Sequence, residues 1–228
     1  MLDVHLPHKL HGFWEFLLHL FTITVGLLIA TQIESCVEWR HHVHLAEEAR
    51  MELRAEIESN LKQLKQHLPE VKRFRQIIDT DLAILRIIQQ HQKVPQDQMA
   101  HFTVRTGSVD LSDTAWKTAQ TTGALAYMPY EEAEEYASIY QAQSSLLSLE
   151  EKPGEEFRAL IGLEAKFFPL RGNLDKLTAE QAGDYAEILG RMRAQMAEAD
   201  TQLQNTIEKG SAYLENRKAR EDVETNVN

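Results

Sequence analysis

A continuous apolar run near the N-terminus constrains this chain more than any other feature. Residues 12–33 read GFWEFLLHLFTITVGLLIATQI. A helix over residues 13–33 would rise roughly 31 Å at about 1.5 Å per residue, which is close to the hydrocarbon thickness of a bilayer. The run is too long for a secretory signal core, and no small-residue cleavage site follows it. It therefore predicts one retained transmembrane helix.

The rest of the chain has the composition of one soluble domain. The 228 residues are 43% hydrophobic and 26% charged, and no alternating β pattern is present. We therefore expect an all-α protein in which one N-terminal transmembrane helix continues into an elongated soluble helical bundle. The expected parts are a short N-terminal segment (1–11), the transmembrane helix (12–33), the bundle domain (34–219) and a frayed polar tail (220–228).

Proline and glycine positions predict where the first helices end. Neither residue occurs between Gly26 and Pro69, so the membrane helix should run on for some forty residues or more until Pro69 breaks or kinks it. A second helix is expected from residue 70 to about 92, followed by a loop over residues 93–110. Ser112 is then expected to cap a short helix that stops at Gly123.

Two longer helices are predicted in the C-terminal half. Pro129 suits the first turn of a helix over residues 130–152, and Pro153-Gly154 should end it. A short helix over 155–168 and a turn with Pro169, Gly172 and Asn173 should follow. Thr178 and Gln181 form a capping-box pattern that opens the last helix.

The bundle core is predicted from apolar stripes of helical period. One stripe lies on the long first helix, and a longer one lies on the last helix from Ile188 to Leu214. Trp116 is expected to anchor the short helix in the same core. The predicted core anchors are Trp116, Leu53, Ile57, Leu61 and Leu64.

Polar and small residues inside the apolar run predict a contact face. Ionisable groups at membrane depth usually face protein, and small residues let helix backbones approach closely. Such residues fall on one face at spacings of 4, 3, 4 and 4. They are Glu15, His19, Thr22, Gly26 and Ala30.

No motif for catalysis is found, so we expect no enzyme activity and no cofactor. A nucleophile elbow, a Gly-rich phosphate loop and a CxxC pair are all missing from the sequence. The net charge of −11 argues against nucleic acid as a partner. A metal site just past the membrane is the alternative to an interfacial polar belt, which we favour. The metal candidates are His41, His42, His44 and Glu48.

Several short segments resemble a widespread bacterial family. They are Val25-Gly26-Leu27-Leu28-Ile29-Ala30, Gln32-Ile33, Glu38-Trp39, Leu53-Arg54-Ala55-Glu56-Ile57 and Asn60-Leu61, then Ala115-Trp116, Thr122-Gly123-Ala124-Leu125 and Tyr140. They resemble an uncharacterised family of single-pass membrane proteins, a domain of unknown function with an "IGILIALQINNWNE"-like membrane helix. The resemblance implies an inner-membrane protein with an extracytoplasmic C-terminal domain. It brings no activity and no catalytic residue.

Local charge argues for the opposite orientation. Lys9 precedes the span whereas Arg40, Arg50 and Arg54 follow it, and the positive-inside rule then favours a cytoplasmic C-terminal domain. We follow the resemblance and expect the bundle to be periplasmic or otherwise extracytoplasmic.

Three functions fit these features. The first is a structural or accessory protein in the lipid bilayer, assembled through its membrane helix as a homo-oligomer or as a subunit of a larger membrane complex. The second is an extracytoplasmic ligand-sensing bundle that signals through a partner. The third is an accessory subunit that ligates a pigment or haem through His19, which an absorption spectrum of the purified protein would test.

Overall fold

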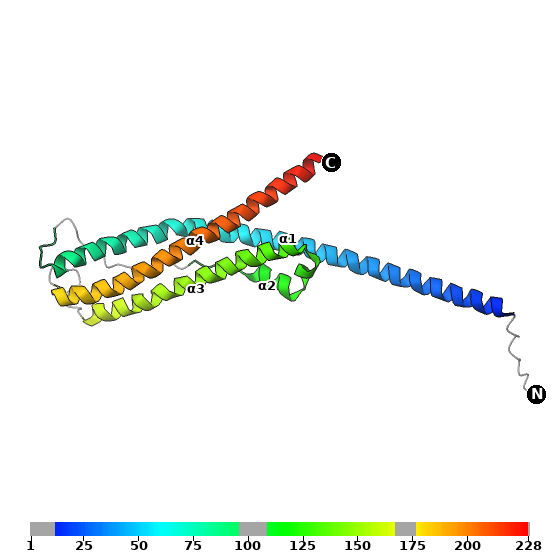
Figure 1. Ribbon diagram of the computed structural model, residues 1–228, viewed down its shortest axis with the longest axis horizontal. Coiled ribbons are helices and arrows are strands. Elements are labelled where there is room, and N and C mark those ends of the chain that lie inside the picture. The colour runs from blue at the N-terminus through cyan, green and yellow to red at the C-terminus, as the bar shows by residue number, and fades with distance from the viewer. Residues whose placement is uncertain (1–11, 96–108, 167–176, 228) are drawn as a thin grey trace, which may run out of the picture. The chain divides into compact units, whose positions relative to one another are not determined.

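The computed structural model of the protein describes residues 12–95, 109–166 and 177–227. Its elements are α1 (Gly12–Gln89), α2 (Thr114–Thr121), the 3-10 helix η1 (Ala124–Tyr127), α3 (Tyr130–Lys166) and α4 (Ala179–Val227) (Figure 1). All of these elements are helices, and the described ranges contain no strand. The expected all-α fold class is thus confirmed.

The chain forms two compact units, and the boundary between them falls within α1. The first unit is Met1–Glu48 and the second is Ala49–Asn228. In the first unit the described residues belong to the N-terminal part of α1. The second unit is a helical bundle that combines the remainder of α1 with α2, α3 and α4.

A break or a kink is predicted at Pro69, and the break is wrong because α1 continues through this residue to Gln89. Pro69 is exposed, so its ring meets solvent and not packed side chains. The turns on either side bury Leu64 and Val71, which belong to the same apolar cluster. Packing of both flanks outweighs the loss of one intrahelical hydrogen bond, and the two predicted helices are one.

The predicted break at Pro153-Gly154 is also wrong. α3 runs from Tyr130 to Lys166 in one piece, and it joins the two helices predicted on either side of this dipeptide. Leu146 before the dipeptide and Leu160 after it are both buried in the bundle cluster. Tertiary packing again overrides a local breaking signal.

Other predicted boundaries have mixed outcomes. α4 continues to Val227, through most of the segment expected to be a frayed tail. Residues 92–95 and 109–113 have no regular structure, as the predicted loop requires, whereas its middle, residues 96–108, lies outside the described residues. The predicted turn with Pro169, Gly172 and Asn173 also lies outside them.

Two predicted helix signals are present in the structure. Gln181 Oε1 accepts a hydrogen bond from the Thr178 amide at 2.9 Å, and Thr178 Oγ1 accepts one from the Gln181 amide at 3.2 Å. This reciprocal pair is the capping box predicted at the start of α4. Gly123 follows α2 with a φ of 74°, a left-handed conformation that glycine adopts without steric cost, and it ends the helix as expected.

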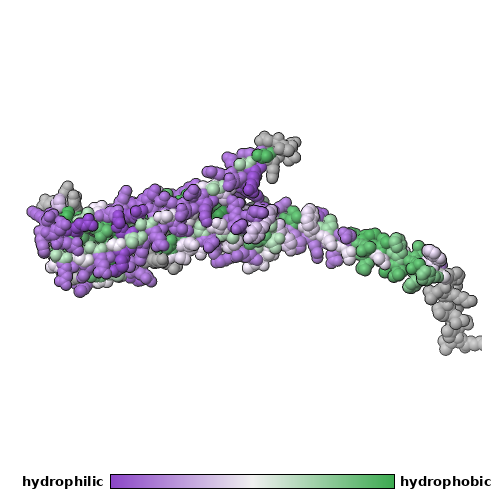
Figure 2. Space-filling model, viewed as in Figure 1, coloured by the Kyte–Doolittle hydropathy of each residue, from purple (hydrophilic) through white to green (hydrophobic). Residues whose placement is uncertain are grey.

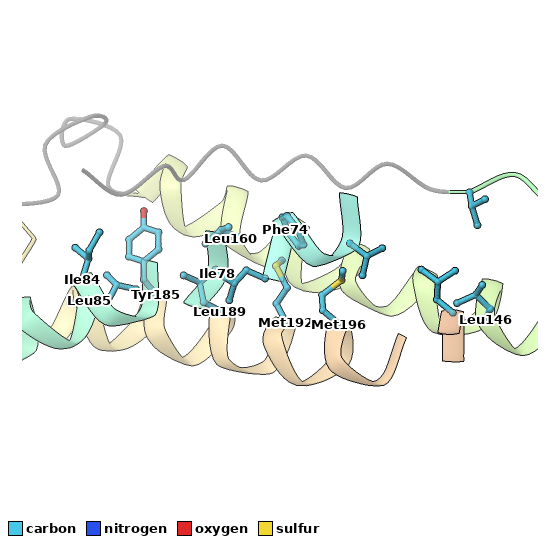
Figure 3. Close-up of a cluster of buried hydrophobic side chains, with 14 of the residues drawn as sticks. Phe74, Ile78, Ile84, Leu85, Leu146, Leu160, Tyr185, Leu189, Met192 and Met196 are labelled. Carbon is cyan, nitrogen blue, oxygen red and sulfur yellow. The ribbon is translucent and has the colours of Figure 1, made fainter. Parts of the chain in front are cut away.

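The bundle core lies between the second half of α1, α3 and α4. Leu53, Ile57 and Leu64 of α1 are almost fully buried, and so are Met192 and Leu203 of α4. Figure 3 shows the α1–α4 part of this core, in which side chains from three helices gather between the ribbons. The labelled residues are Phe74, Ile78, Ile84, Leu85, Leu146, Leu160, Tyr185, Leu189, Met192 and Met196.

Two ion pairs also join α1 to α4. Arg75 of α1 bonds Asp200 of α4, and Arg193 of α4 bonds Asp79 of α1. Asp200 is buried, so its charge requires the partner that Arg75 supplies. The order of the contacts, Arg75 with Asp200 and Asp79 with Arg193, reflects the antiparallel alignment of the two helices.

The apolar run at the start of α1 leaves its large side chains uncovered. Phe13, Trp14, Phe21, Ile23 and Leu27 are all more than 60% exposed. Figure 2 shows a hydrophobic surface on this part of α1, in contrast to the largely hydrophilic surface of the bundle. α1 is the one helix in the described ranges that is long and apolar enough to cross a membrane.

Candidate functional site

Glu56 of α1 is the centre of a polar site in the bundle. Its carboxylate accepts hydrogen bonds from the Ser112 hydroxyl, from the Tyr140 hydroxyl at 2.7 Å and from the Ala115 amide at 3.0 and 3.1 Å. The Trp116 amide adds a longer contact of 3.4 Å. Ala115 and Trp116 lie in the first turn of α2, whose amides have no intrahelical partner. Glu56 therefore caps α2 from another helix and ties it to α1 and α3.

Ser112 was expected to cap this helix, and the structure corrects that assignment. The residue at the N-cap position is Asp113, whose side chain makes no capping hydrogen bond. Ser112 Oγ donates to Glu56, and its contacts with the amide and the hydroxyl of Thr114 are both long, at 3.3 Å. The carboxylate supplies both the negative charge and the acceptors that a helix N-terminus favours.

Asn60, one turn further along α1, continues the site. Its Nδ2 donates to the Ser112 carbonyl at 2.7 Å, and its Oδ1 accepts from the Ser112 amide at 3.1 Å. Nδ2 also donates to Gln143 Oε1 of α3 at 3.0 Å. Asn60 is fully buried, so these bonds offset the cost of burying its amide. These hydrogen bonds fix the position of Ser112, just before α2, against α1.

A cleft lies directly beyond these residues, between α2 and α3. It has a volume of about 400 Å³, within the range of about 300–1,000 Å³ typical of small-ligand sites. Trp116 and Tyr140 lie on its wall with their rings nearly parallel, at 13° and 5.2 Å between centroids. Its polar lining includes Lys117, Gln120, Gln141, Gln143 and Ser144.

Further polar contacts extend the site toward the start of α3. Arg50 donates two hydrogen bonds of 2.9 Å to Glu132, and Arg217 of α4 lies 3.5 Å from the same carboxylate. Tyr213 of α4 donates to the hydroxyl of Tyr136 at 2.8 Å. Polar contacts therefore join α1, α3 and α4 in this half of the bundle.

Burial and hydrogen bonding shift the pKa values of two groups at the site. Burial raises the pKa of Tyr140, and the hydrogen bond that its hydroxyl donates to Glu56 raises the pKa further, so the phenol stays protonated. Burial also works against ionisation of Glu56. The hydrogen bonds from Ser112, Ala115, Tyr140 and Trp116 outweigh it and hold the pKa of Glu56 below its ordinary value of 4.5.

This shift predicts a pH dependence of stability. Because the pKa of Glu56 is lower in the folded than in the unfolded chain, its contribution is complete above about pH 4.5 and is lost as the pH falls below that value. Glu56→Gln should lower the melting temperature at pH 7, and its difference from the wild type should shrink below pH 4.5. Thermal denaturation followed by circular dichroism from pH 7 to pH 3 measures this. Glu52→Gln is the control, because Glu52 is exposed. If the difference in melting temperature between Glu56→Gln and the wild type stayed constant with pH, the expectation would be contradicted.

The structure places Trp116 differently from its expected role as a core anchor. Trp116 is half-buried and lies at the cleft, outside the apolar cluster. Ala119 is the buried residue of α2. The other predicted anchors, Leu53, Ile57, Leu61 and Leu64, are buried. Trp116 packs on Tyr140 instead, with the two ring centroids 5.2 Å apart.

The predicted contact face lies on an uncovered stretch of α1. Glu15, His19, Thr22, Gly26 and Ala30 are exposed, and a Cβ built at Gly26 would meet no atom within 4 Å. The Thr22 hydroxyl donates to the Leu18 carbonyl at 2.9 Å. Its proton is thus satisfied within the helix, and only its acceptor lone pairs remain for a neighbour.

The metal candidates do not gather into a site. His41 and His42 are neighbours with ring centroids 5.9 Å apart. Within residues 12–95, 109–166 and 177–227, no group of three or more His, Cys, Asp or Glu side chains could hold a metal ion. His41, His42, His44 and Glu48 are therefore not brought together there.

Sequence reasoning missed Glu56, Asn60 and Gln143 as site residues. Glu56 is one of many glutamates on a long helix, and nothing in its local spacing sets it apart. The signal that could have found it was the resemblance, whose separate segments contain Glu56, Asn60, Trp116 and Tyr140. The structure brings these segments together around the cleft.

Comparison of the chain with family models, curated proteins and solved structures finds no match.

Proposed function

We propose that the protein is a membrane-anchored structural or accessory protein. The N-terminal part of α1 crosses the inner membrane once, and the protein assembles through this helix with itself or with a larger membrane complex. The observation that carries the proposal is the exposure of the apolar segment. None of its most apolar 18-residue window is buried, and such a continuous apolar surface is unfavourable in water.

Details of the segment agree with a bilayer environment. Trp14 and Trp39 are 82% and 65% exposed, and they bracket a helical rise of roughly 37 Å at about 1.5 Å per residue. Tryptophan favours the two membrane interfaces. The hydroxyls of Thr24, Thr31 and Ser35 donate to carbonyls of their own helix, so they can enter an apolar medium without unpaired donors.

Membrane integration is tested by extraction. The full chain should stay in the membrane pellet after washing with alkaline sodium carbonate and should be released by detergent. Ile23→Arg combined with Leu27→Arg should release most of it, because a charge at membrane depth is costly. Met51→Arg with Val223→Arg is the matched control, since these bundle residues are also apolar and exposed. Release of the wild type by carbonate would contradict the anchor.

Assembly is tested at the predicted contact face. Lipid tails are as apolar as leucine, so close packing at small residues drives helix association in a bilayer. Gly26→Ile should reduce crosslinking between membrane helices several-fold because its branched side chain keeps backbones apart. Leu28→Ile is the control of similar size. Equal crosslinking for both variants would exclude Gly26 from the interface.

We place the bundle outside the cytoplasm, as the resemblance implies. A reporter that is active only in the cytoplasm should fail when it is fused after Asn228. If this reporter were active, the bundle would lie in the cytoplasm and the proposed orientation would be wrong.

One observation favours a second function, ligand sensing by the bundle. The cleft lined by Trp116 and Tyr140 is tied by hydrogen bonds to Glu56 and Asn60 of α1, and α1 is the helix that contains the apolar segment. A ligand that moved these side chains would therefore act on α1 directly, and a partner would carry the signal further.

A further inference from the structure

The cleft between α2 and α3 contains a buried polar side chain with unused hydrogen-bonding capacity. Gln143 is 5% exposed and lines the cleft. Its Oε1 accepts from Asn60 Nδ2 at 3.0 Å, which fixes the amide orientation. No acceptor for Gln143 Nε2 is found among the described residues. The Nε2 atom itself is accessible to solvent although the residue as a whole is buried, so this donor is open to an acceptor on a ligand.

The other side chains of the cleft are mostly uncharged hydrogen-bonding groups. Gln120, Gln141 and Ser144 are exposed and line the same cleft. Glutamine and serine side chains both donate and accept. A hydroxyl group also both donates and accepts, so a ligand with several hydroxyls could form hydrogen bonds with all of these side chains at once.

The charged residues of the cleft compensate each other. Lys117 Nζ lies 2.8 Å from Asp113 Oδ2, and both residues line the cleft. A strongly charged ligand would have to separate this pair or leave its own charge unmatched. The cleft therefore favours a neutral ligand.

An aromatic wall completes the cleft. Trp116 is half-buried, and its ring stacks on that of buried Tyr140. The face of an aromatic ring carries partial negative charge, so it attracts the weakly positive C–H groups of a sugar ring. Residues 111–113 line the cleft before α2 begins, and the rest of the lining belongs to helices α2 and α3. An extended peptide would find no strand edge to pair with.

From these features we propose that the cleft binds a short neutral saccharide. Trp116 lies beside the C–H face of one sugar ring, and Gln143 Nε2 donates to a hydroxyl oxygen. Gln120, Gln141 and Ser144 bind further hydroxyls. The inference rests on the second proposed function and deepens it, because it names the ligand class that the bundle would sense.

Tryptophan fluorescence of the full chain in detergent tests the proposal. The chain has three tryptophans, so Trp14→Phe with Trp39→Phe leaves Trp116 as the only reporter, at the cleft itself. Chitotriose and maltotriose are the probes, and a neutral tripeptide of alanine, serine and glycine is the competing ligand class. We expect a saturable fluorescence change with at least one trisaccharide and none with the peptide.

Gln143→Met in this background should weaken saccharide binding about tenfold, as expected for a lost buried hydrogen bond. The matched control is Gln202→Met, which removes a 3.2 Å hydrogen bond to the Ala142 carbonyl outside the cleft and should leave binding unchanged. If circular dichroism shows that Gln143→Met does not fold, Gln120→Ala and Ser144→Ala replace it. Each of these two variants should weaken saccharide binding about threefold.

Three results would overturn the proposal: no saturable change with either trisaccharide, a saturable change with the peptide alone, or wild-type affinity in the folded cleft variants. None of them affects carbonate extraction or crosslinking. Failure of the saccharide site is therefore distinguishable from failure of the membrane anchor.

Discussion

Leu189→Ala is expected to lower the free energy of unfolding of the bundle by about 2–5 kcal/mol, the range for truncating a buried leucine. Leu189 is fully buried in the cluster that joins α1, α3 and α4. Figure 3 shows it beside Ile78 and Met192. The cavity left by alanine would be lined by side chains from rigid helices, which cannot collapse into it. Urea denaturation of the full chain in detergent, followed by circular dichroism, measures the loss.

Ile161→Ala is the control for this experiment. Ile161 lies on α3 and is 48% exposed, so its truncation should change the unfolding free energy by no more than about 0.5 kcal/mol. An equal loss for both variants would mean that Leu189 does not belong to the core.

Asn60→Leu should destabilise the bundle by about 2–4 kcal/mol, because it removes three hydrogen bonds, of which the bond to Gln143 is buried and the two bonds to Ser112 are part-buried. Leucine has a similar size but cannot accept from the Ser112 amide or donate to the Ser112 carbonyl. Gln143 Oε1 would also lose its donor. The same denaturation experiment measures the effect. Near-ultraviolet circular dichroism should in addition show a changed environment of Trp116, because Asn60 positions the chain that leads into α2.

Asn205→Leu serves as the comparison, since Asn205 is exposed on α4. It should leave both the denaturation midpoint and the Trp116 signal unchanged. A mild effect of Asn60→Leu, similar to that of Asn205→Leu, would show that the contacts of Ser112 do not hold α2 in place.

Local signals with a specific stereochemical requirement were predictable from the sequence. Gly123 ends α2 because its backbone adopts a positive φ. Thr178 and Gln181 form the capping box because their side chains reach each other's amides over three residues. The buried stripe of α4, with Met192 and Leu203, follows from helical periodicity alone.

Signals that depend on tertiary context were not predictable. Pro69 and Pro153 are both strong helix breakers in isolation, yet both lie within long helices whose flanking turns are packed in one core. The cap of α2 comes from Glu56, 59 residues before Ala115. No rule based on neighbouring residues can find such a cap. For the same reason the cleft was not anticipated, although Trp116 on its wall had been singled out for the core.

The contacts between α1 and α4 determine when the bundle can fold during synthesis. Arg75 and its partner Asp200 are 125 residues apart in the chain. At about 5–20 residues per second, a ribosome needs roughly 6–25 s to pass from one to the other. During this interval Phe74, Ile78 and Leu85 have no α4 to cover them, while the apolar segment before them has already left the ribosome. Under the proposed membrane anchoring, insertion of that segment would precede completion of the bundle, and the incomplete domain would need a chaperone or the lipid surface to cover its apolar residues until α4 emerges.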